Sequence, residues 1–194
     1  MSKDNRRLKI SFNSPVVLTF AILMFVATLL GMASNYSITR ALFSTSRSGL
    51  LNIMTYIRLF THVIGHWSFQ HFISNVSVLL LLGPMLEEKY GGGVLVEVIL
   101  ITAVITGVIN NVLFPFSCLA GASGVVFAFI ILASFTEFKK GEIPLTFILV
   151  AVFYIGNQIW DGVTLRDNIS NLSHIIGGLC GAWSGYLLNM KTGK

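Results

Sequence analysis

The chain has 194 residues, of which 54% are hydrophobic and only 11% charged, and its formal net charge is +5. A soluble domain carries about twice that charged fraction, so the composition predicts a protein embedded in a membrane. No basic stripe with interleaved aromatic side chains is present, which argues against a nucleic-acid partner. Two cysteines cannot build a disulfide framework.

Six apolar segments approach the roughly 20 residues that a helix needs to cross a bilayer. In chain order they are 15–33, 72–86, 94–114, 121–136, 143–160 and 172–189. The second and fourth are short and begin with polar residues, so their first turns are expected to lie inside protein, below the membrane surface. We therefore predict an all-α integral membrane protein, with residues 1–194 forming one six-helix domain.

The distribution of Lys and Arg predicts the orientation, because these residues favour the cytoplasmic side of a membrane. With a cytoplasmic N-terminus, nine of the 13 basic residues lie on that side and four on the other. Both termini are therefore predicted to be cytoplasmic, with residues 1–14 as a tail. The stretch 34–71 is then external, and its scattered apolar residues predict short helical turns half embedded in the interface.

Two chemically active side chains head separate apolar segments. Ser123, in Gly121-Ala122-Ser123-Gly124, opens the fourth segment, and His174 opens the sixth. Both groups are costly to bury within a bilayer, and together they suit nucleophilic catalysis, with serine as nucleophile and histidine as general base. At a helix start the Ser123 N–H would be unpaired and could stabilise an oxyanion, while Gly124 would leave space for a substrate carbonyl. The alternative is that Ser123 is only a helix cap.

Glycines follow His174 at intervals of four residues: Gly177, Gly181 and Gly185, with Gly178 beside them. Small residues at this spacing let two membrane helices approach closely. The fourth segment offers a complementary small face, made of Gly121, Gly124 and Ala128. The stripe is either a packing motif alone or the feature that brings His174 to Ser123, since ordinary helix pairs lie 8–10 Å apart.

Polar residues also gather at the start of the second segment: His62, His66, His71 and Asn75. His71 and Asn75 share a helix face, and the Asn75 amide suits either an oxyanion or a helix-to-helix hydrogen bond. His62 and His66 have the spacing of metal ligands. However, a His-Glu-x-x-His zinc protease needs a glutamate where this chain has Val63, so we predict no metal and no other cofactor.

These residues together resemble the rhomboid family of intramembrane serine proteases, in particular its six-helix bacterial members. Arg58-Leu59-Phe60-Thr61-His62 with His66, His71 and Asn75 is similar to the family's second-helix motif, and the resemblance implies an oxyanion hole of His66, Asn75 and the Ser123 N–H. Residues Gly121–Gly124 resemble the family's nucleophile motif, and His174 with Gly177 and Gly181 resembles its catalytic sixth helix. Glu87 ahead of Gly91 matches the acidic residue and glycine that close the second helix.

Two positions depart from the family pattern. Ile57 precedes Arg58 where the family often has tryptophan, and Phe127 stands where a tyrosine usually packs against the catalytic histidine. Phenylalanine keeps the aromatic face and loses the hydroxyl. We expect His71, Gly121, Gly124, Phe127, Gly177 and Gly181 to support the site.

The resemblance implies an intramembrane serine endopeptidase in a bacterial inner membrane. It would cleave transmembrane proteins near the outer face through a Ser123–His174 dyad, in contact with membrane lipid. One alternative is a non-catalytic rhomboid-like chaperone or adaptor. Another is a transporter, but the only acidic residue within a predicted span is Glu97, close to its cytoplasmic end.

Overall fold

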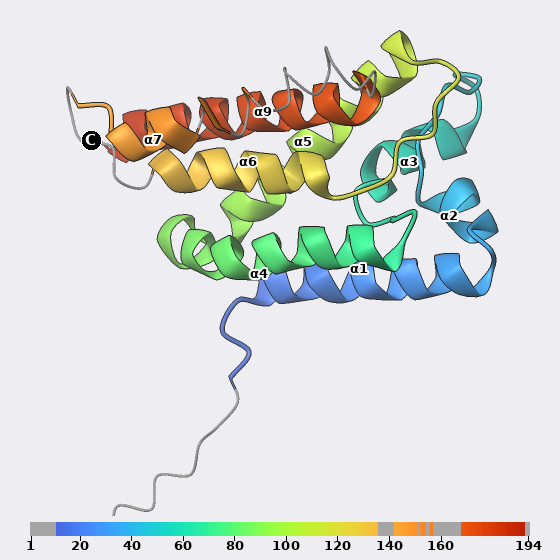
Figure 1. Ribbon diagram of the computed structural model, residues 1–194, viewed down its shortest axis with the longest axis horizontal. Coiled ribbons are helices and arrows are strands. Elements are labelled where there is room, and N and C mark those ends of the chain that lie inside the picture. Colours follow the sequence, from blue (N-terminus) through green and yellow to red (C-terminus); the bar gives the residue numbers. More distant parts are fainter. Residues whose placement is uncertain (1–10, 136–141, 151, 154–155, 157–167, 193–194) are drawn as a thin grey trace, which may run out of the picture.

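A computed structural model of the protein describes residues 11–135, 142–150, 152–153, 156 and 168–192. These residues form eight helices, and a single antiparallel bridge between Thr45 and Leu119 is recorded among them. Figure 1 shows long helices running roughly side by side, with two short helices grouped at one end. The prediction of an all-α protein is confirmed for the described part of the chain.

Three helices are long and apolar enough to cross a membrane. They are α1 (Pro15–Ala33), α4 (Phe69–Tyr90) and α5 (Gly92–Leu113). The first has the predicted bounds. The second is longer than the apolar segment 72–86 at both ends, because the Ser68 hydroxyl caps its first turn by accepting the His71 N–H at 3.1 Å and because charged residues continue it to Tyr90.

The remaining predicted spans are only partly tested. Helix α6 (Ser123–Ser134) is apolar but has 12 residues, and α9 (Asn168–Thr192) has 25, long enough to extend roughly 37 Å. Within the predicted span 143–160, α7 (Leu145–Val150) is described, whereas much of 151–160 lies outside the described residues. The count of six spans and the cytoplasmic termini therefore stay predictions.

The stretch between α1 and α4 contains α2 (Ser37–Leu42) and α3 (Ile53–Thr61), as expected for a loop with short helical turns. In Figure 1 both lie at the right-hand end of the bundle. On α3, Ile53, Ile57 and Phe60 are exposed and share one face, the spacing of an amphipathic helix. This apolar face supports the expectation that the loop lies partly in the membrane interface.

Helix α6 is the central element of the bundle. Every residue from Gly124 to Leu132 is buried, and α6 packs against α4, α5 and α9; Figure 1 shows it between α9 and α4. A helix that is apolar all round is suited to such a position. The helix that begins with Ser123 is therefore held from several sides.

Glu87, in the last turn of α4, lies where α1, α4 and α5 meet. Its carboxylate is buried and accepts the backbone N–H groups of Val16 and Val17, each at 3.0 Å. Ser14 makes no side-chain cap for α1, so this carboxylate takes that place at the positive end of the helix. Gly91, with φ of +85°, then turns the chain from α4 into α5. Glu87 thus connects α4 to the start of α1, and Gly91 connects α4 to α5.

Candidate active site

Ser123 is the first residue of α6 and is half-buried. Its backbone N–H belongs to the first turn of the helix, where N–H groups have no partner within the helix and the dipole is positive. Ser123 therefore lies at a helix start, as its position in the sequence predicted, and not within a helix.

The chain before Ser123 is held by backbone hydrogen bonds from distant residues. Thr45 and Leu119 exchange two of them, at 2.8 and 2.9 Å, and the Gly121 N–H donates to the His62 carbonyl at 2.9 Å. The Ala122 N–H faces His66 Nε2 at 3.5 Å. These contacts fix residues 119–122, and therefore the position of the serine that follows.

Gly121 is required at its position for two reasons. Its φ of +143° lies in a region that residues with a Cβ rarely adopt. In addition, a Cβ built there would lie 2.6 Å from Cε1 of His71. The close approach places the His71 ring directly beside the loop that leads to Ser123.

The His174 ring stacks on Phe127. The two ring centroids are 4.4 Å apart and the planes differ by 4°. Phe127 follows Ser123 by four residues, so both lie on one face of α6, and the imidazole is therefore within about one helical turn of the serine. The aromatic contact expected of Phe127 is present despite the missing hydroxyl.

The glycine stripe of α9 packs directly against the backbone of α6. A Cβ built on Gly177 would lie 2.8 Å from the Gly124 Cα, and one built on Gly181 would lie 2.8 Å from the Ala128 Cα. Real Cβ contacts are not this short. The small faces predicted on the two segments therefore meet, and only glycine permits this separation.

His62 and His66 are both buried, and their nitrogens face different groups. His62 Nδ1 lies 3.1 Å from the Arg58 carbonyl and its Nε2 3.3 Å from the Thr106 hydroxyl. His66 Nδ1 lies 3.4 Å from the Thr28 hydroxyl. Within the described ranges, no three His, Cys, Asp or Glu side chains gather closely enough to hold a metal ion. These two histidines connect the loop to α1 and α5.

His71 and Asn75 lie on the first turns of α4. The His71 ring is half-buried and meets the His66 ring edge-on, with centroids 5.0 Å apart. Asn75 is buried, and its Nδ2 donates to the His71 carbonyl at 3.0 Å. This bond lies within α4, in place of the helix-to-helix bond that the sequence left open, and it orients the amide one turn above the His71 backbone.

Several contacts of the site had no signal in the sequence. Thr28, Thr45 and Thr106 position the loop or its histidines, yet each is an ordinary threonine among apolar residues. An isolated hydroxyl within an apolar segment is a weak indication of such a role, since threonine can also satisfy itself by bonding the carbonyl four residues earlier. Thr28 and Thr106 both make that bond as well.

We expect stability to fall in mild acid. Burial lowers the pKa of His62 to about 4 and that of His66 to about 3, so both rings are neutral in the fold. When unfolded they bind protons below about pH 6.5. Their contribution is therefore complete above that pH and is lost as the pH falls toward the folded values, by about 1 kcal/mol for each at pH 5.5.

Unfolding in mixed micelles at pH 7.5 and 5.5 measures this difference. The variant His66→Gln removes one of the two groups and should lose less stability than the wild type between the two pH values. Equal sensitivity to pH in both proteins would contradict the assignment of a neutral, buried His66.

The fold and the site together define a helical membrane bundle with a serine at a helix start beside a histidine on a close-packed neighbouring helix. The family model for the rhomboid domain matches residues 54–191, which is more than half of the chain. This protein belongs to the rhomboid family. Its members are in general serine proteases that act on transmembrane substrates within the membrane, and the protein is an integral membrane protein.

Proposed function

We propose that this protein is an active intramembrane serine endopeptidase that uses Ser123 and His174 to cleave transmembrane proteins near the outer face of a bacterial inner membrane. The observation that carries the proposal is the stacking of His174 on Phe127, one turn from Ser123 on α6. The contact of Gly177 with the α6 backbone supports it, because it brings the backbones of α6 and α9 into direct contact near Ser123 and His174.

In the proposed reaction, His174 removes the hydroxyl proton of Ser123 as Oγ attacks the substrate carbonyl carbon. The tetrahedral intermediate collapses, the C–N bond breaks, and His174 returns the proton to the leaving amine. Water then attacks the carbonyl carbon of the acyl-enzyme while His174 removes its proton. The ester C–O bond breaks, and His174 returns the proton to Ser123 Oγ. The acidic residues of the described part of the chain belong to the last turn of α4, the first two turns of α5 and the segment just before α7. Figure 1 shows these elements at the end of the bundle opposite the start of α6, which supports a dyad rather than a triad.

For the oxyanion hole we now favour His71 over His66. His66 is fully buried, and its Nε2 faces the Ala122 N–H, which can only donate. That nitrogen is therefore an acceptor and is not free to donate to an oxyanion. His71 is half-buried beside Gly121, and we propose that it donates together with Asn75 and the Ser123 N–H.

We expect His71→Ala and Asn75→Ala each to reduce kcat by about 10²–10³-fold, because losing one oxyanion donor costs that much when the others remain. His66→Ala should instead mainly lower stability, since it empties a buried position that supports the Ala122 N–H. The measurements are steady-state cleavage of a single-span substrate and unfolding in micelles. A larger kcat loss for His66→Ala than for His71→Ala, at equal stability, would return His66 to the oxyanion hole.

A fluorophosphonate probe distinguishes the protease from a non-catalytic rhomboid-like adaptor with the same fold. We expect the purified protein in detergent to be labelled at Ser123, because an activated serine is needed for that reaction. Incubation with candidate single-span proteins and mapping of the cut should then place cleavage near the outer end of the span. A folded protein that neither labels nor cleaves would support the adaptor.

A further inference from the structure

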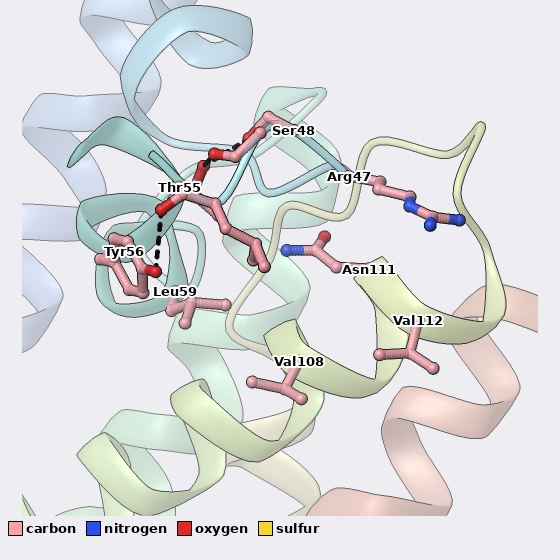
Figure 2. A pocket seen from close by; sticks show the side chains of 10 residues that line it. Arg47, Ser48, Thr55, Tyr56, Leu59, Val108, Asn111 and Val112 are labelled. Atoms are coloured by element: carbon pink, nitrogen blue, oxygen red, sulfur yellow. Dashed lines mark hydrogen bonds between the residues drawn. The ribbon is translucent and has the colours of Figure 1, made fainter. Parts of the chain in front are cut away.

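A cavity of about 750 Å³ lies away from the Ser123–His174 site. Figure 2 shows α3 and the preceding loop on one side of it and the last turns of α5 on the other. Its apolar wall comes from Leu59, Val108 and Val112, and Arg47 stands at its edge. Ligand pockets have volumes of roughly 300–1,000 Å³, so this one is large enough for part of a small amphipathic molecule.

The wall on the loop side is held in place by hydrogen bonds. The Ser48 and Thr55 hydroxyls are 2.7 Å apart, and the Tyr56 hydroxyl donates to the Leu50 carbonyl at 2.9 Å; both bonds are drawn in Figure 2. On the α5 side, Asn111 is held by Thr45, whose hydroxyl lies 3.0 Å from Asn111 Nδ2. The lining of the pocket is thus fixed on both sides by hydrogen bonds of the protein itself.

The charge at the edge of the pocket has no described counterpart. Arg47 is exposed. The acidic residues of the described part of the chain belong to the last turn of α4, the first two turns of α5 and the segment just before α7, and these elements lie at the other end of the bundle from α3 (Figure 1). A guanidinium group binds phosphate through two parallel hydrogen bonds. The edge of the pocket therefore favours an anionic oxygen group.

The place of the pocket at the end of a candidate membrane span indicates that it lies near a membrane surface. Val108 and Val112 belong to the last two turns of α5, one of the helices long enough to span a bilayer. Leu50 is 75% exposed and Leu51 fully exposed beside the pocket, which is expected of residues inserted into the lipid interface. A ligand that reaches this site from the membrane would have its polar end at Arg47 and its apolar part along α5.

We propose that this pocket binds a membrane glycerophospholipid, with the phosphate at Arg47 and the upper part of an acyl chain along Leu59, Val108 and Val112. Anionic and zwitterionic phospholipids both carry the phosphate. The apolar wall favours the binding of a lipid over the binding of free phosphate, because only a lipid has an acyl chain to bury there. The inference does not depend on proteolytic activity, because it uses only the loop residues 47–50, α3 and α5.

Native mass spectrometry of the full, delipidated protein tests the proposal, with titration by phosphatidylglycerol, phosphatidylcholine and, separately, soluble glycerol 3-phosphate. We expect at least one phospholipid molecule to be retained, and the Kd for that molecule to rise about tenfold or more in Arg47→Gln, because a charge-assisted hydrogen bond is lost. Val112→Trp should weaken binding by filling the apolar side. Glycerol 3-phosphate should not bind detectably.

Two matched variants control for charge and for bulk. Arg40→Gln removes the same charge from the same loop but does not line this pocket, and Leu113→Trp adds the same side chain at the next position of α5. Both should retain the lipid as the wild type does. Equal loss in Arg40→Gln, unchanged Kd in Arg47→Gln, or tighter binding of glycerol 3-phosphate than of lipid would each overturn the proposal. The proposal would also be overturned if Arg47→Gln cleaved a transmembrane substrate more slowly but retained lipid as the wild type does. That result would indicate that this surface binds the protein substrate and not a lipid.

Discussion

Replacing Ser123 or His174 with alanine should abolish cleavage of a transmembrane substrate, a loss on the order of 10⁶-fold in kcat, because nucleophile and base act as a unit. The double variant should be no worse than either single one. Both variants should remain folded, since Ser123 is only half-buried and α6 is held by apolar contacts along its whole length.

The matched control for this experiment is Ser134→Ala, a serine at the other end of α6 that bonds only the Ile130 carbonyl of its own helix. It should cleave normally. Cleavage and fluorophosphonate labelling are measured on the same preparations, together with unfolding in micelles. Near wild-type turnover in folded Ser123→Ala or His174→Ala protein would rule out the dyad.

The second large effect is expected at the glycine stripe. Valine at Gly177 or Gly181 places a branched side chain within 2.8 Å of an α6 Cα atom, so α6 and α9 must separate. A misplacement of about an ångström can cost on the order of 10²-fold in rate, and overpacking costs about 1–3 kcal/mol of stability. We expect both losses together in steady-state cleavage and in unfolding.

Valine variants at different positions of the glycine stripe distinguish an effect on activity from an effect on stability. Gly185 meets the Phe135 side chain, three turns below His174, so Gly185→Val should lose stability but keep more activity than Gly177→Val. Gly178 is buried and is therefore not a neutral site, although it lies off the stripe. Leu179, which is 60% exposed on α9, provides the control as Leu179→Val. Normal activity in Gly177→Val would show that close helix approach is not needed for the reaction.

Hydropathy predicted the helices well where they are uniformly apolar and less well at their polar ends. The bounds of α1 match the predicted segment, whereas α4 and α9 are longer than expected. Caps and charged last turns continue a helix without adding hydrophobicity, so an apolar segment marks only the part within the membrane. Length alone also could not show that α6, with 12 residues, is the buried centre of the bundle.

The histidine cluster shows the limit of reasoning from spacing. His66 and His71 are both single histidines near Asn75, and the motif does not say which ring is enclosed. The structure buries His66 between Thr28 and Ala122 and leaves His71 half-buried beside Gly121. That difference depends on α1 and on the loop before α6, which are distant from both histidines in the sequence.

By itself the sequence determined that this protein is a helical membrane protein and which side chains are suited to its chemistry, because hydrophobic segment length and residue type are local properties. Only the tertiary structure decided how close those side chains come. The stacking of His174 on Phe127, the contact between Gly177 and Gly124, and the pairing of Thr45 with Leu119 each join residues more than 40 positions apart. Such contacts arise from how the helices pack against one another, and a residue pattern records the small side chains that permit the packing but not the distance that results.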